Sequence, residues 1–291
     1  MEYQEFLEEK QKLLNYILEF VDNQDDDKSN YANLLKFLNN QNTIKNRGRF
    51  QAFLCLLNKI SDNHHRSPGF FKKIDKIIIQ YKQEIKQTFS NSEIFNIFKS
   101  NKRNLLLLFK EKIVDIDQYI LDKMIEDFEE NNYLNPTYFY PELKNKIPNL
   151  QLDIDEFDIN DIELFELNRE IGENENKICQ LIRDDLLDDF IIYVNQTNKS
   201  LSDMIQPSIF ETNSFLLDKT VSLIEYATFF GSIQIFKYLK MNNIEVKDTL
   251  LICAIHGNNT EIINDINNDD LKPETQLIYF LESIKCFHNE I

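Results

Sequence analysis

The side chains in this sequence that could perform acid–base, nucleophilic or metal chemistry are few. The 291 residues include four histidines and four cysteines. An imidazole acts as a general base or a metal ligand near neutral pH, and a thiolate acts as a nucleophile or a metal ligand. His64 and His65 precede Arg66 in the predicted loop 62–69. A helix-capping role is the favoured interpretation of this loop, and a metal or phosphate site is the alternative.

The other histidines and the cysteines form no catalytic set by their spacing. Cys286 and His288 are two residues apart, and side chains at i and i+2 of a helix point away from each other. The cysteines contain no C-x-x-C pair, so neither a zinc clip nor a disulfide framework is predicted. Phosphate-loop, dinucleotide, serine-hydrolase and zinc-protease motifs are also absent from the sequence. We therefore expect no catalytic, cofactor-binding or metal residue and no enzyme activity, with an unrecognised enzyme as an alternative.

Charge is distributed unevenly along the chain. There are 32 basic and 49 acidic side chains, a net charge of −17, which argues against a surface that coats nucleic acid. Residues 41–103 nevertheless carry an excess of basic side chains. This stretch predicts a solvated helix face that attracts the protein's own acidic segments, and binding of nucleic acid or an anionic surface is the alternative. The acidic segment 151–176 predicts either a linker that lies on a basic surface or a partly disordered recognition segment.

Helical periodicity positions these residues throughout the chain. Apolar side chains recur at i, i+3 and i+4, while the sequence has only 5 glycines and 6 prolines for turns. No segment combines strict alternation with hairpin turn residues, so no sheet is predicted. No apolar run exceeds the six residues of Ala52–Leu57, far fewer than the ~20 residues of a membrane span. We expect an all-α protein in the cytoplasm without a membrane span.

Two stretches near the carboxy-terminus align when Gly231 is placed on Gly257. Each has a small residue shortly before the glycine, Ala227 or Ala254, and aliphatic residues after it. Small residues let paired helices approach, and glycine ends a helix in the left-handed conformation without steric cost. We therefore expect each glycine to terminate the first helix of a helix pair. Residues 283–291 form a fainter third copy, in which Cys286 takes the place of the glycine.

These copies resemble ankyrin repeats, on Leu223–Ala227, Gly231, Ile235, Phe236 and Leu239. The family's Thr-Pro and His are missing, and the glycine spacing is shorter than usual, so its β-hairpin finger is expected to be trimmed. With Ser208–Leu217 and Ala254–Asn259, the chain is more specifically similar to a large family of uncharacterised ankyrin-type proteins expanded in a parasitic protist.

The resemblance implies stacked helix pairs in an ankyrin-like α-solenoid over residues 177–291. It leaves residues 1–150 as a divergent helical domain, with 151–176 as the acidic linker between them. The implied function is a non-enzymatic scaffold that binds a partner protein of unknown identity on its concave face. In the family, residues just before each glycine point to that face, here Phe229, Phe230, Ile255, His256 and Lys285. Packing against the preceding repeat is the alternative for Phe229 and Phe230.

The third copy stops where the second helix of its pair should begin. A solenoid normally closes with a unit that covers the apolar face of its last repeat. We therefore expect either that the full-length protein is longer than this chain or that this end pairs with something, because the exposed apolar remnant would attract a second copy or a partner. The remnant comprises Tyr279, Phe280, Ile284 and Phe287.

Overall fold

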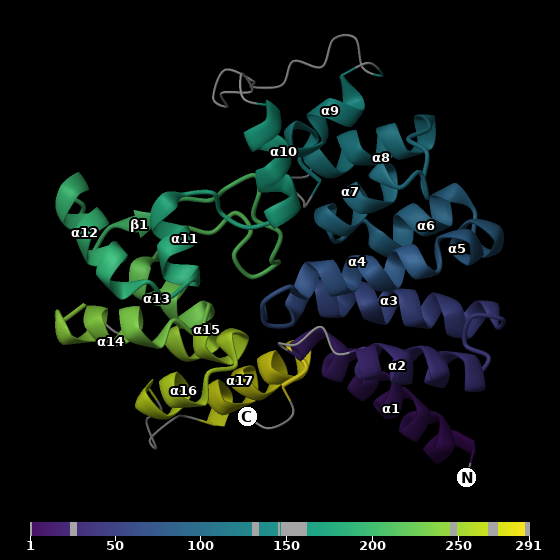
Figure 1. Ribbon diagram of the computed structural model, residues 1–291, viewed down its shortest axis with the longest axis horizontal. Coiled ribbons are helices and arrows are strands. Elements are labelled where there is room, and N and C mark those ends of the chain that lie inside the picture. Colours follow the sequence, from purple (N-terminus) through teal and green to yellow (C-terminus); the bar gives the residue numbers. More distant parts are fainter. Residues whose placement is uncertain are drawn as a thin grey trace. The chain divides into compact units, whose positions relative to one another are not determined.

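The computed structural model describes residues 2–23, 28–129, 134–144, 146, 162–244, 249–266 and 273–288, and it is helical almost throughout (Figure 1). The all-α prediction is confirmed. The chain divides into two compact units, one of residues 1–62 and 67–152, the other of residues 63–66 and 153–291.

The first unit consists of short helices joined by tight turns. They are α1 (Glu2–Asp22), α2 (Lys28–Asn40), α3 (Arg47–Asn63), α4 (Phe70–Gln80), α5 (Lys82–Thr88), α6 (Asn91–Phe98), α7 (Lys102–Lys110), α8 (Gln118–Glu129), the 3-10 turn η1 (Pro136–Phe139) and α9 (Tyr140–Leu143). The apolar spacing explains their packing, as in α4, where Ile74, Ile77 and Ile78 have no exposed surface.

Basic side chains of residues 41–103 contact other groups of the first unit. Both terminal nitrogens of Arg103 donate to the Asp75 carboxylate, at 2.6 and 2.8 Å. Lys82 pairs with Glu111 at 3.0 Å, and Lys86 donates to a backbone carbonyl at 2.8 Å. These contacts agree with a stretch that attracts the protein's own acidic groups. The sequence also predicts that this stretch approaches the acidic segment 151–176 or that this segment is poorly ordered, and residues 151–161 of the segment lie outside the described residues.

The second unit contains helix pairs. Its elements are α10 (Ile162–Ile171), α11 (Lys177–Arg183), α12 (Leu187–Thr197), β1 (Met204–Ile205), β2 (Val221–Ser222), α13 (Leu223–Phe229), α14 (Ile233–Met241), α15 (Leu250–Gly257), α16 (Thr260–Ile266) and α17 (Pro273–Lys285). The pairs are α11 with α12, α13 with α14, and α15 with α16, and the first helices stack in the order α11, α13, α15, α17. The second helices stack in the same way, so the arrangement is solenoid-like (Figure 1).

All four first helices are followed by a residue with left-handed backbone, which after α11 is Asp185 with φ 50°. Gly231, the residue after the C-cap Phe230 of α13, has φ +68°, which confirms that it terminates that helix. Gly257 is the last residue of α15, but Asn258 takes the left-handed position there with φ 47°. Gly257 is required for a different reason, because a Cβ atom at this position would lie 2.5 Å from the Thr228 carbonyl oxygen. Phe287 follows α17 in the same conformation, with φ 63°.

Two features of the second unit differ from the sequence expectations. A two-stranded antiparallel sheet pairs Met204 with Ser222 and Ile205 with Val221, where no sheet is predicted. Residues 162–171 of the acidic segment form the helix α10, whose Phe165 and Arg169 are buried. These two side chains anchor the helix, because Phe165 contacts the ring of Phe210 at a centroid distance of 5.3 Å.

Candidate functional site

The structure buries most of the residues expected to contact a partner. Phe229, Ile255 and His256 are at most 4% exposed. The Phe229 ring lies 5.1 Å from the His256 ring, because the last turns of α13 and α15 pack against each other. The expectation that these three residues face a partner is therefore wrong. Phe230 is half-buried and Lys285 is exposed, and their role in binding stays a prediction.

The helix α17 has an exposed apolar face. Leu277, Phe280, Leu281 and Ile284 follow the i, i+3, i+4, i+7 spacing of a single stripe, and each is at least 50% exposed. Glu282, which contacts His256 of α15, lies on the side of the helix that packs against α15. The exposed remnant predicted from the sequence is confirmed for Phe280 and Ile284, whereas Tyr279 and Phe287 are half-buried.

All four histidines of the protein lie in the second unit. His64 and His65 come from the loop 63–66, and His288 follows α17. One ring nitrogen from each of these three side chains lies within 4.8 Å of the other two. His65 Nδ1 is 3.2 Å from His288 Nε2, while His64 Nδ1 is 3.0 Å from the Cys286 carbonyl oxygen. Three imidazoles from two distant segments therefore converge on one point.

The fourth histidine belongs to a neighbouring relay of hydrogen bonds. Cys286 Sγ is 3.4 Å from His256 Nδ1, and His256 Nε2 is 2.8 Å from Glu282 Oε1. Because a carboxylate only accepts, Nε2 carries the proton of the neutral ring and Nδ1 accepts from the thiol. The thiol, imidazole and carboxylate thus follow the order of a nucleophile, a base and an orienting acid.

Burial decides what this relay can do. Cys286 has no exposed surface, and burial raises the pKa of its thiol to about 12. Burial also lowers the pKa of His256, while the hydrogen bond from His256 lowers the pKa of Glu282 to about 2. A protonated, enclosed thiol is a poor nucleophile. The relay therefore joins α15 to α17 structurally.

The three converging imidazoles have a different character. His64 and His288 are buried, whereas His65 is half-buried. Burial, followed by the neighbouring His64 and His65, lowers the pKa of His288 to about 3. Neutral imidazole is the form that binds metal ions. The sequence offers no spacing signal for this group, because the loop and the end of α17 are separated by more than 200 residues.

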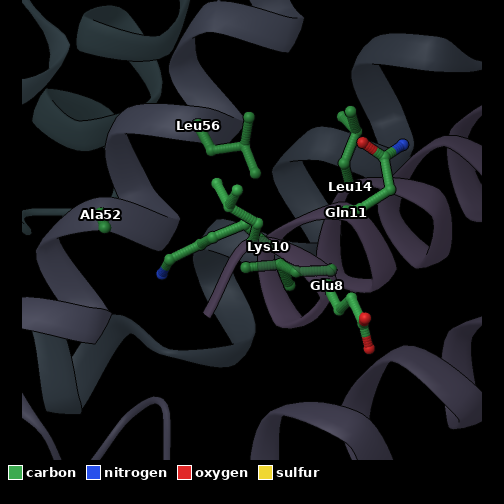
Figure 2. Close-up of a pocket in the computed structure, with 8 residues that line it drawn as sticks. Glu8, Lys10, Gln11, Leu14, Ala52 and Leu56 are labelled. Atoms are coloured by element: carbon green, nitrogen blue, oxygen red, sulfur yellow. The ribbon is translucent and has the colours of Figure 1, made fainter. Parts of the chain in front are cut away.

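The first unit has an open groove of about 620 Å³ between α1 and α3 (Figure 2). Its walls are mainly apolar, with one carboxylate and one ammonium group. The lining residues are Leu7, Glu8, Lys10, Gln11, Leu13, Leu14, Ala52 and Leu56. None of them is a histidine, a cysteine or a member of a carboxylate pair, so the lining residues of the groove provide no set of catalytic groups.

Comparison with known proteins gives no match, whether to protein-family models, to curated proteins or to solved structures. Over the described part of the chain, no helix has the length and apolar character that crossing a membrane requires.

Proposed function

We propose that this protein is a non-enzymatic interaction scaffold of the ankyrin-like type, and that its second unit binds a helix of a partner protein. The observation that carries the proposal is the exposed stripe on α17, formed by Leu277, Phe280, Leu281 and Ile284. An apolar stripe of this kind on a soluble surface marks an interaction site.

The stack of first helices indicates what would occupy the stripe. Helices α11, α13, α15 and α17 pack in sequence, each covering an apolar face of its neighbour. The outer face of α17 continues this series. Its natural occupant is therefore an amphipathic helix with apolar residues at i, i+3, i+4 and i+7. If a second copy of this chain supplies that helix, the same contact produces self-association.

The cysteines agree with a cytoplasmic setting for this scaffold. All four are free thiols, of which Cys179, Cys253 and Cys286 are buried. Unpaired cysteines are typical of a reducing compartment.

A photo-crosslinking amino acid at position 281 tests the proposal in cells. We expect crosslinks to an apolar helical segment of one protein, and the crosslinked peptide identifies it by mass spectrometry. The variant Phe280→Glu with Ile284→Glu should abolish the crosslinks, because a desolvated carboxylate is costly. Met241, which is 77% exposed at the end of α14, supplies the control as Met241→Glu.

Two results would count against the proposal. Crosslinks that persist in the double variant, or that scatter over many unrelated surfaces, would show that the stripe has no specific occupant. Crosslinks only between copies of this chain would identify self-association. Light scattering over a range of concentrations would then show a dimer that the double variant loses.

A further inference from the structure

We propose that His64, His65 and His288 bind a divalent zinc ion. Imidazole nitrogen is a preferred zinc ligand, and three histidines with one further position make a known type of zinc coordination. The three side chains lie in the same unit and direct ring nitrogens to within 4.8 Å of one another. This site is independent of the partner-binding role proposed above.

Backbone carbonyls set two of the rings in the tautomer whose Nε2 can bind zinc. His64 Nδ1 is 3.0 Å from the Cys286 carbonyl oxygen, and His288 Nδ1 is 2.7 Å from the Ile255 carbonyl oxygen. Carbonyl oxygen only accepts, so Nδ1 carries the proton of each neutral ring. Nε2 then carries the lone pair. A carbonyl that orients a histidine through its other nitrogen is the usual support around a metal-binding imidazole.

The separation of the third ring also fits a shared ion. His65 Nδ1 and His288 Nε2 are 3.2 Å apart. Two nitrogens on one tetrahedral zinc ion, each at 2.0–2.1 Å, are about 3.3 Å apart. The ring centroids of His64 and His65 are 4.3 Å apart, and each lies just over 5 Å from that of His288.

A second group, His256, Glu282 and Cys286, also has potential ligand atoms within 4.8 Å of one another. Zinc at that position would displace the hydrogen bonds of His256 to both Glu282 and Cys286. Zinc on the three imidazoles replaces the contact between His65 and His288 but leaves the carbonyl contacts of His64 and His288 in place. The geometry therefore favours the three imidazoles.

Calorimetric titration of the full chain, stripped with a chelator, with zinc chloride tests the site. We expect one zinc ion per chain and a rise in melting temperature. His65→Gln should weaken binding by at least about 100-fold, since even supporting residues change metal affinity by 10–100-fold. His65 is half-buried, so this variant should keep the helical circular dichroism of the wild type. His256→Gln is the matched control and should bind zinc within about threefold of the wild type.

Cobalt substitution distinguishes the two groups of ligands. The proposal predicts the visible bands of tetrahedral cobalt with nitrogen ligands and no thiolate charge-transfer band. A charge-transfer band that disappears in Cys286→Ser would place the ion on the second group and overturn the assignment. Absence of zinc binding by the folded wild type, or unchanged binding by His65→Gln, would also overturn it and leave the histidines as a hydrogen-bonded cluster.

Discussion

Gly257 should tolerate no side chain, even though it is a helical residue. A Cβ atom there would lie 2.5 Å from the Thr228 carbonyl oxygen, 3.0 Å from that of Phe229 and 3.1 Å from the Gly231 nitrogen. All three are backbone atoms, so no side chain can rotate away. Relieving the shortest contact requires α13 and α15 to separate by on the order of 1 Å, and overpacking of this kind costs about 1–3 kcal/mol.

Helix propensity acts in the opposite direction. Alanine is favoured over glycine inside a helix by up to about 1 kcal/mol, and by less at a helix end. We therefore expect Gly257→Ala to lower the free energy of unfolding by about 2 kcal/mol. Gly48, in the first turn of α3, is the matched control because a Cβ atom at this position would meet nothing closer than 3.6 Å. Gly48→Ala should be neutral or stabilise by up to about 1 kcal/mol.

Hydrogen exchange measured by mass spectrometry suits a chain with two units, because each peptide reports on its own unit. Peptides from α13 and α15 should exchange roughly 30-fold faster in Gly257→Ala, since about 1.4 kcal/mol corresponds to a factor of ten. Peptides of the first unit should be unchanged. If the α13 and α15 peptides of Gly257→Ala exchange at the wild-type rate or more slowly, the close approach of the two helices is refuted.

Three further predictions concern single interactions. The pKa of Glu282 is lowered to about 2 by the hydrogen bond from His256, so its stabilising effect should be complete above about pH 4.5 and lost as the pH falls towards 2. The Glu282 side chain is 19% exposed, so solvent screening reduces this stabilisation to roughly 2 kcal/mol. In urea unfolding, Glu282→Gln should have a lower free energy of unfolding than the wild type at neutral pH, and the difference should vanish at low pH. Asp75→Asn removes the bidentate carboxylate partner of the buried Arg103 and should cost about 3 kcal/mol, with exchange in α4 and α7 as the readout; a loss below about 1 kcal/mol would contradict it. Ser222→Ala removes the capping box with Glu225 and should destabilise α13 by about 1 kcal/mol, whereas Ser222→Asp should restore it in the same exchange assay.

Much of the fold could be predicted from local patterns. The apolar spacing of Ile74, Ile77 and Ile78 predicts a helix face that is buried, as observed. Gly231 marks a helix end because its left-handed backbone is a local property that the sequence can signal. Cys286 and Gly257, which the sequence aligns, each precede a residue with positive φ, whereas Gly231 has positive φ itself.

Long-range packing explains what the sequence could not predict. Gly231 and Gly257 are both glycines, but the requirement for glycine at position 257 comes from the approach of Thr228 in the preceding helix pair. The repeat position of His256 predicts a residue that faces a partner, yet Phe229 and Glu282 enclose it. The sheet of β1 and β2 involves two residue pairs, which is too short to produce alternation.

The position of the loop 63–66 in the sequence affects the order in which parts of the protein fold. It belongs to the second unit, although it is flanked by α3 and α4 of the first. His64 contacts the carbonyl of Cys286, which is 222 residues further along the chain. A ribosome that adds about 5–20 residues per second needs roughly 10–40 s to cover that distance. During synthesis the helices on either side of the loop can pack long before the loop meets its final neighbours, so the histidine cluster is assembled as a late, post-nucleation event rather than as a seed of folding.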